Sequence, residues 1–163
     1  MTKILLLSDT HGYMDDAILK HAAEADEVWH AGDFGSMEVV EKLQNTNLLR
    51  GVFGNIDGQE IRTEFPEELF FEVEGVRVYM KHIAGYPGKY SAKVKLAIEN
   101  YKPKLVVCGH SHILKIMHHA PTQHLHINPG AVGKSGFHKV RTMVKFNLHK
   151  GTICDAAVIE FNK

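Results

Sequence analysis

The amino-acid sequence predicts an α/β fold, and three observations lead to this prediction. Short apolar runs alternate with segments of helical spacing over the first third of the chain. A hairpin pattern and further short strands follow in the remainder. Several apolar runs end in small polar clusters, as expected of buried strands that lead into functional loops. The chain has 163 residues, enough to enclose a core, and we expect a single domain over residues 1–163.

The amino-terminal part of the chain predicts a parallel sheet. Apolar runs at residues 3–8, 27–31 and 47–53 indicate strands, and residues 14–25 and 37–43 carry apolar side chains at helical spacing. Strand, helix, strand, helix and strand at this pitch are typical of βαβ units, whose strands lie parallel in one sheet.

The second part of the chain changes character. Alternating apolar runs flank the turn dipeptide Glu74-Gly75, which predicts a hairpin. A helix is expected from Ser91, a suitable N-cap residue, to Asn100, and Pro103 follows its end. We expect the remaining strands at residues 104–108, 113–119, 123–128, 142–148 and 152–161.

Composition and charge restrict the classes of function. Lys plus Arg equal Asp plus Glu at 19 each, and such a neutral chain is not expected to bind nucleic acid or anionic membranes in general. No apolar run is long enough for a signal-peptide core or a membrane span, so we expect a cytoplasmic protein. The two cysteines do not indicate a disulfide framework, and Cys108 is expected to be buried as a small hydrophobe. Homo-oligomer formation stays open.

Histidine is unusually frequent, with 12 residues in the chain, and several histidines follow apolar runs together with Asp or Asn. Ligands of an open α/β sheet gather outside the carboxyl ends of its strands, so these polar groups are expected to converge. Imidazole, carboxylate and amide oxygen together suit Mn²⁺, Zn²⁺ or Fe better than Ca²⁺. The candidate metal ligands are Asp9, His11, Asp33, Asn55, His82, His110 and His112.

The order of these motifs resembles a known family, the calcineurin-like metallophosphoesterases. The motifs that carry the resemblance are Asp9-Thr10-His11, Gly32-Asp33, Gly54-Asn55-Ile56-Asp57, His82 and Gly109-His110-Ser111-His112. The small size and Asn128-Pro129-Gly130 are similar to the compact YfcE-type phosphodiesterase branch, whose fold is shared by the retromer subunit Vps29. The resemblance covers the chain from residue 4 to about residue 131.

The resemblance implies a four-layer α/β/β/α sandwich and two divalent metal ions, manganese in the first place, with zinc, iron or nickel as alternatives. It assigns Asp9, His11, Asp33 and His112 to one ion, and Asp33, Asn55, His82 and His110 to the other. Asp33 would bridge the ions. The implied activity is hydrolysis of a phosphodiester or phosphomonoester of a small molecule, with a metal-bridging hydroxide as nucleophile.

Three residues are expected to act beyond simple metal binding. Asn55 and His110 are placed to donate hydrogen bonds to the phosphate, and Asp57 is either a third catalytic residue or the cap of a turn before Gly58. Ile56 departs from the family pattern, because many members carry at that position a His proposed to protonate the leaving group. His138 is an alternative proton donor.

Two alternatives to this enzyme remain open. The first is a protein-binding scaffold like Vps29 without significant catalysis, and the second is a nuclease, which the neutral charge disfavours. A scaffold does not require all seven ligands, and this chain has them, so the enzyme is favoured.

Four histidines near Pro121 lie outside the candidate ligand set. They are interpreted as exposed hairpin residues rather than a second metal site: His118, His119, His124 and His126.

Overall fold

The computed structural model describes residues 1–163 and contains two five-stranded sheets. The first sheet has the order β10-β9-β1-β2-β3 and the second β4-β5-β6-β8-β7. The strands are β1 (Thr2–Leu7), β2 (Glu27–His30), β3 (Leu48–Gly51), β4 (Glu68–Val73), β5 (Val76–Lys81), β6 (Leu105–Val107), β7 (Leu114–His119), β8 (His124–Pro129), β9 (Val140–His149) and β10 (Thr152–Asn162). The helices are α1 (Asp16–Glu24), α2 (Met37–Gln44), α3 (Gln59–Glu64), α4 (Ala92–Tyr101) and the short 3₁₀ helix η1 (Ala120–Thr122).

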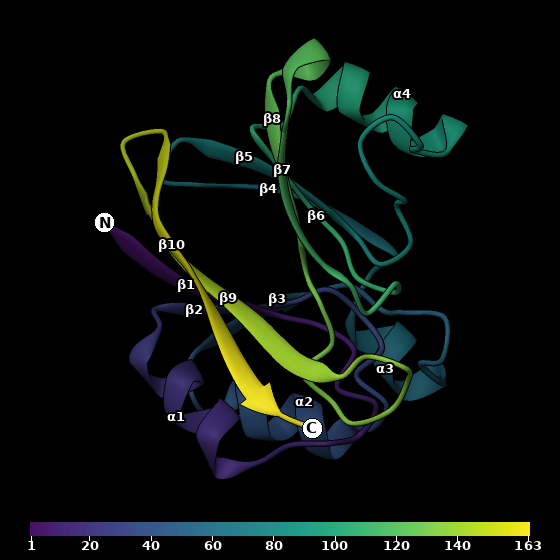
Figure 1. Ribbon diagram of the computed structural model, residues 1–163, viewed down its shortest axis with the longest axis vertical. Helices are drawn as coiled ribbons and strands as arrows, with labels where there is room; N and C mark the ends of the chain where they lie inside the picture. Colours follow the sequence, from purple (N-terminus) through teal and green to yellow (C-terminus); the bar gives the residue numbers. More distant parts are fainter.

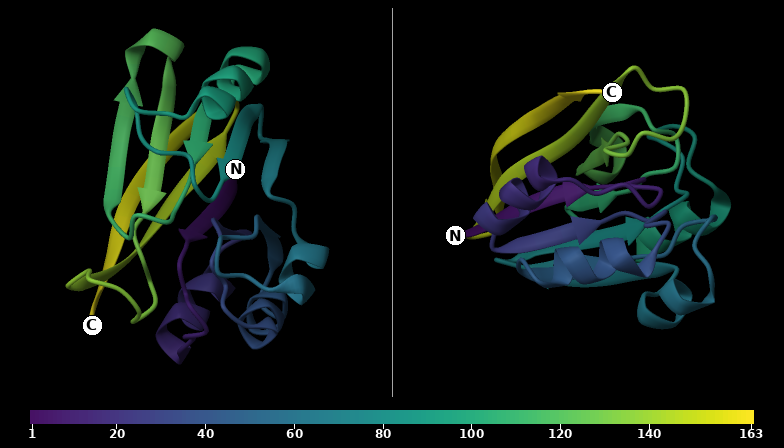
Figure 2. Two further views of the ribbon diagram at one scale, coloured as in Figure 1. Left: turned by 90° about the vertical axis from the view of Figure 1, so that its right-hand side faces the viewer. Right: turned by 90° about the horizontal axis from the view of Figure 1, so that it is seen from below.

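The predicted four-layer α/β/β/α sandwich is confirmed. Helices α1 and α2 lie on one side of the molecule and α4 on the other, with the sheets between them (Figure 1). Seen from below, α1 and α2 lie along the outer face of the first sheet (Figure 2, right). No helix in the structure has the length and hydrophobicity needed to span a lipid bilayer.

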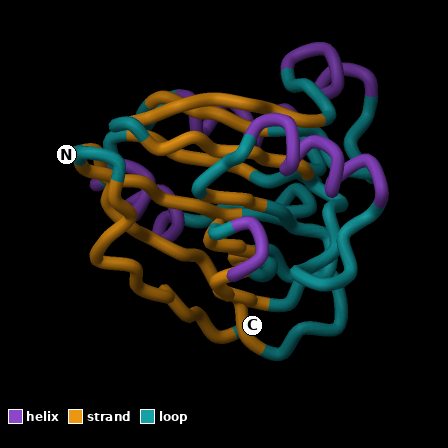
Figure 3. Tube along the Cα trace, turned by 90° about the horizontal axis from the view of Figure 1, so that it is seen from above, coloured by secondary structure: helices purple, strands orange, loops and turns teal.

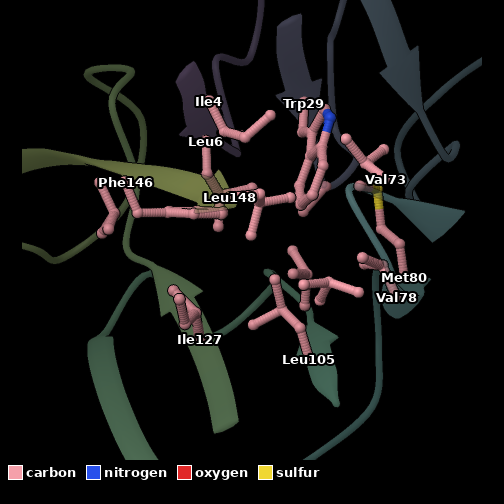
Figure 4. Packing of buried hydrophobic residues seen from close by; sticks show 14 of the residues in the cluster. Ile4, Leu6, Trp29, Val73, Val78, Met80, Leu105, Ile127, Phe146 and Leu148 are labelled. Atoms are coloured by element: carbon pink, nitrogen blue, oxygen red, sulfur yellow. The ribbon is translucent and has the colours of Figure 1, made fainter. Parts of the chain in front are cut away.

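Strand β1 shows how the sequence produces this layering. Leu5 and Leu7 pack under α1 and α2, while Ile4 and Leu6 point into the space between the sheets. A continuous apolar run is therefore needed, because the strand is buried on both faces. In the central core Trp29 and Phe146 of the first sheet face the second sheet, which contributes Met80, Leu105 and Ile127 among others (Figure 4).

The parallel and antiparallel parts of the sheets also follow the sequence pattern. Strands β1, β2 and β3 are parallel, as predicted, and the β4–β5 hairpin pairs Val73 with Val76 across Glu74-Gly75. Ser91 caps α4 as expected, because its side chain accepts a hydrogen bond from the Val94 N–H. Helix α3 was not anticipated, since it has only six residues and Ile61 is its only buried side chain. Long loops gather beyond one end of the strands (Figure 3, right).

Two expectations about side-chain burial have different outcomes. Cys108 is fully buried and both cysteines are free thiols, as expected. The interpretation of His124 and His126 as exposed hairpin residues was wrong, because both are buried and both contact Tyr90. The Tyr90 hydroxyl lies 2.9 Å from His124 Nε2 and 2.8 Å from His126 Nδ1, so the two imidazoles have a partner inside the protein.

Candidate metal centre

The loops that follow five strands bring the seven candidate ligands to one place. Their donor atoms form two groups, Asp9 with His11 and His112, and Asp33 with His82 and His110; within each group the atoms lie within 4.8 Å of one another. Asn55 joins the second group, because its Oδ1 lies 3.1 Å from His82 Nε2 and 3.0 Å from His110 Nδ1. The grouping matches the division into two ions that the resemblance implies.

Asp33 lies between the two groups. Its Oδ2 is 3.4 Å from His11 Nε2 on one side and 3.2 Å from His82 Nε2 on the other. Its Oδ1 accepts a hydrogen bond from the backbone N–H of Ile56 at 3.0 Å, which fixes the plane of the carboxylate. One oxygen atom of Asp33 therefore faces the ligands of both groups, as a bridging carboxylate requires.

The backbone at the candidate ligands is unusual. Asp9, His11, Asp33, His110 and His112 all have positive φ angles, between 46° and 73°. Residues other than glycine rarely adopt this left-handed conformation, and strained backbone of this kind is concentrated at functional sites. The sharp turns direct successive side chains of one loop toward a common centre.

Glycine is required where these turns approach one another. A Cβ atom on Gly54 would lie 2.0 Å from Asp33 Oδ1, and one on Gly109 would lie 2.1 Å from Ser8 Oγ. Real Cβ atoms do not come this close to other atoms, so a side chain at either position would displace a ligand loop. The Gly-polar motifs in the sequence thus reflect close packing of the loops around the centre.

Two electron-pair donors among the candidate ligands have no hydrogen-bond partner. Asp9 Oδ1 and His11 Nε2 are buried and unpartnered, although Asp9 Oδ1 lies 3.1 Å from His112 Nε2 and 3.7 Å from His11 Nε2. Buried polar atoms are almost always satisfied in folded proteins. Acceptor atoms that converge without donors are the arrangement that a cation satisfies, so the residues fit a bound metal ion.

The tautomer of His82 supports the same conclusion. Its Nδ1 lies 2.6 Å from the Ala31 carbonyl oxygen, which can only accept, so Nδ1 must carry the proton. In the neutral ring Nε2, which faces Asp33 and Asn55, therefore keeps its free electron pair. A carbonyl that holds the far nitrogen of a histidine in this way is a common second contact of metal-binding histidines.

The pKa values at the centre reflect the carboxylates. Burial would raise the pKa of Asp9, but the neighbouring His11 and His112 imidazoles outweigh it and hold that pKa well below its usual range. The Asp9 carboxylate raises the pKa of His11. Burial opposes a charge on His82, yet the carboxylates of Asp33 and Asp9 raise its pKa. The centre thus strongly favours positive charge among its carboxylates.

His30 supports the ligand loops from beneath. It accepts a hydrogen bond from the Gly32 N–H at Nδ1 and donates from Nε2 to Thr10 Oγ1 at 3.0 Å, while its ring stacks on Phe34. Full burial lowers the pKa of His30 to about 3, so the ring stays neutral. His30 is thus both a core residue and a support of the candidate ligand loops.

Asp57 is directed away from the ligand atoms. Its buried carboxylate accepts hydrogen bonds from the backbone N–H groups of Asp33, Phe34, Gly35 and Gly54. These four bonds hold the loops after β2 and β3 together. The carboxylate therefore positions Asp33 and its loop, and a direct catalytic role of Asp57 stays a prediction.

His138, considered above as a proton donor, lies beside the first group of ligands. Its ring packs edge-on against His112, with ring centroids 5.3 Å apart, and its Nε2–H donates to the Gly133 carbonyl at 2.8 Å. Its Nδ1 is buried without a partner, and burial lowers the pKa of His138. A lowered pKa disfavours the protonated form that a general acid needs.

Sequence reasoning missed several residues that complete the centre. Ser8 Oγ donates to Asp9 Oδ2 at 2.6 Å, and Asn128 Nδ2 donates to the Gly109 carbonyl at 2.9 Å. Ser8 directly precedes a candidate ligand, which could have identified it, whereas Asn128 was noted only as part of Asn-Pro-Gly.

The larger pockets of the protein, near α1 and near α4, contain none of the seven candidate ligands, so donor chemistry and not cavity size identifies this centre.

Comparison with known proteins gives concordant results. Residues 2–151 match the family model described as the calcineurin-like phosphoesterase superfamily domain. A probable metallophosphoesterase of Mycoplasma pneumoniae is 34% identical over 95% of this chain and 95% of its own length. A phosphodiesterase of Methanocaldococcus jannaschii is 25% identical over 68% of this chain and 73% of its own.

Solved structures share the fold. A Thermotoga maritima protein studied by solution NMR superposes with a TM-score of 0.76 at 25% identity, covering 99% of this chain and 100% of its own. Wild-type Vps29 of Entamoeba histolytica, solved in complex with zinc, superposes with a TM-score of 0.75 at 11% identity, covering 98% of each chain. At this low identity the likeness to Vps29 concerns the fold alone.

Proposed function

This chain belongs to the calcineurin-like phosphoesterase superfamily, and on that basis we propose that it is a dinuclear-metal-dependent phosphoesterase acting on a small molecule. The proposed reaction is hydrolysis of a phosphodiester or phosphomonoester bond. The observation that carries the proposal is the pair of ligand groups on either side of Asp33 Oδ2, with donor atoms that lack protein partners.

The proposed ligands of the first ion are Asp9, His11, Asp33 and His112, and those of the second are Asp33, Asn55, His82 and His110. Mn²⁺ is the proposed metal, since mixed imidazole and oxygen ligands suit it, and zinc, iron and nickel share this preference. When bound, two divalent ions would supply Lewis acidity to the phosphoryl oxygens and a nucleophile derived from water near neutral pH.

The remaining chemistry falls to side chains around the ions. Asn55 and His110 are exposed, and neither Asn55 Nδ2 nor His110 Nε2 has a hydrogen-bond partner within the chain. Asn55 Oδ1 and His110 Nδ1 lie 3.0 Å apart and would both direct an electron pair to the second ion, which leaves the N–H groups of Asn55 Nδ2 and His110 Nε2 to donate to phosphoryl oxygens. Such preorganised donors stabilise the charge that develops on the transferred phosphoryl group.

The leaving group receives no proton from the residue after Asn55. Ile56 is 47% exposed at the centre and has no ionisable group. We therefore propose that the enzyme favours esters with good leaving groups, which depart without general-acid assistance.

The alternative function is a protein-binding scaffold of the Vps29 kind. The likeness to Vps29 supports the shared fold, at 11% identity. A scaffold gains nothing from buried, unpartnered donor atoms at strained positions, because these features cost stability unless a ligand satisfies them. We therefore favour the enzyme.

Turnover of bis-p-nitrophenyl phosphate with added Mn²⁺ tests this proposal. We expect the wild-type protein to release p-nitrophenol and His110→Ala to lose at least about 10²-fold in kcat, as loss of one stabilising donor implies. The exposed His118 lies on β7 outside the ligand set, so His118→Ala is the matched control and should keep wild-type activity. Equal turnover by wild type and His110→Ala would contradict the proposal.

A further inference from the structure

A pocket of about 210 Å³ opens beside the proposed second ion. Asn55 and His82 form its inner edge, and both are proposed ligands. Pockets for complete small ligands are typically larger, about 300–1,000 Å³. The size and position therefore suit one substituent of a phosphate ester whose phosphorus lies at the metal centre.

Arg62 supplies an immobilised positive charge to this pocket. Its Nε donates to the Asp57 carbonyl at 2.7 Å, and the guanidinium lies over the Phe53 ring at 4.5 Å. A longer contact of 3.4 Å joins Nη2 to the Asn55 carbonyl. These partners are neutral, and no carboxylate forms an ion pair with Arg62. The guanidinium is thus held in place while its charge and its remaining N–H groups stay available to an anion.

Lys81 is the second cation of the pocket. Its side chain is 15% exposed, and its ammonium group lies 3.9 Å from Glu68 Oε2, a loose pair. Glu67 also borders the pocket and opposes an anion there, while Phe53 and Ile83 provide apolar wall. The pocket therefore combines an apolar wall with a cationic end, which matches a substituent that has a short apolar body and an acidic group.

We infer that this pocket is a substrate subsite, in which Arg62 and Lys81 bind a second acidic group of the substrate, a carboxylate or a phosphate, carried by the esterified alcohol. The inference rests on the proposed phosphoesterase function and adds a substrate class to it. If Arg62 only held the turn from Asn55 to Asp57, esters with and without the second acidic group would be hydrolysed equally well.

Two matched substrates separate these roles. They are the aryl methyl phosphodiesters of 3-(4-hydroxyphenyl)propanoate and of 3-(4-hydroxyphenyl)propanamide, whose phenols have nearly the same acidity. With Mn²⁺-loaded wild-type protein we expect kcat/KM to be about tenfold higher for the propanoate ester, the value of one charge-assisted hydrogen bond at a partly exposed site. Equal values for the two esters overturn the inference.

Substitutions then assign the preference to residues. Arg62→Gln should reduce the ratio of the two kcat/KM values to near one, Lys81→Gln should reduce it partly, and Glu67→Gln should increase it. A general disturbance of the Asn55 turn would lower kcat/KM by the same factor for both esters and leave their ratio unchanged. That result would contradict the role assigned to Arg62. Arg77 is the matched control, because its guanidinium also lies over an aromatic ring, that of Tyr101, and it does not line the pocket. Arg77→Gln should keep the wild-type ratio.

The failure of this inference is distinguishable from failure of the proposed function. If bis-p-nitrophenyl phosphate is hydrolysed but the two matched esters react equally, only the subsite is wrong; if no ester is hydrolysed, both proposals fail. A measurement without metal provides a second readout. In an NMR titration of metal-free protein, 3-phenylpropanoate should shift the Arg62 Nε–H signal and 3-phenylpropanamide should not, whereas an equal response to both overturns the subsite.

Discussion

The carboxylate of Asp57 accepts a hydrogen bond from the backbone N–H of Asp33 at 3.0 Å, so the proposed bridging ligand is held by a residue that is not itself a ligand. Three further N–H groups of the same loops bind this carboxylate. A partner of this kind orients the ligand, and such contacts typically change metal affinity about 10- to 100-fold when they are lost.

Asp57→Asn tests this relationship. An amide cannot accept hydrogen bonds at its nitrogen, so we expect Mn²⁺ affinity measured by calorimetry to fall by about tenfold or more. We also expect the free energy of unfolding in urea to fall by about 1–3 kcal/mol, because buried N–H groups lose their acceptor. Asp155→Asn, at an exposed position, is the control. Unchanged affinity with a loss of kcat alone would instead indicate direct catalysis by Asp57.

Ile56→His tests whether a missing proton donor limits the reaction. Alkyl leaving groups need protonation more than aryl leaving groups do, so we expect kcat to increase about tenfold or more for a methyl alkyl phosphodiester and little for an aryl one. Ile113 is also exposed and directly follows a proposed ligand, so Ile113→His is the control and should show no such difference. Equal increases for both ester classes would argue against the account of Ile56.

Buried His126 predicts a loss of stability in acid. Burial lowers the pKa of His126 to about 4 and that of His124 to about 4, so the folded protein keeps these rings neutral while the unfolded chain takes up protons near pH 6.5. The contribution to stability is present above pH 6.5 and is lost as the pH falls toward 4.

Urea unfolding of metal-free protein at pH 7 and pH 5 measures this effect. His126→Gln removes one titrating group, so the loss of unfolding free energy between the two pH values should be smaller by about 1–2 kcal/mol than in the wild type. The exposed His149 provides the control variant His149→Gln. A wild-type pH dependence in His126→Gln would mean that this histidine is not held neutral by the fold.

Much of the fold, and the convergence of the candidate ligands, could be predicted because both depend on local patterns. Strands β1, β2 and β3 end two to four residues before Asp9, Asp33 and Asn55, and parallel strands place such loop residues at the same edge of a sheet. Family resemblance then divided the ligands into two groups, a division that the structure repeats.

What could not be predicted depends on contacts between distant segments. The buried His124 and His126 contact the hydroxyl of Tyr90, which lies more than thirty residues away in the sequence. The role of Asp57 follows from the approach of the loops after β2 and β3. Arg62 became a candidate only when α3, too short to give a helical pattern, placed it over Phe53.

The central claim is that Asp33 bridges two metal ions. Anomalous diffraction from crystals of the protein loaded with Mn²⁺ tests it most directly. The account predicts two manganese peaks, one among Asp9, His11 and His112 and one among Asn55, His82 and His110, with Asp33 Oδ2 between them. A single peak, or two peaks that do not share Asp33, would contradict it.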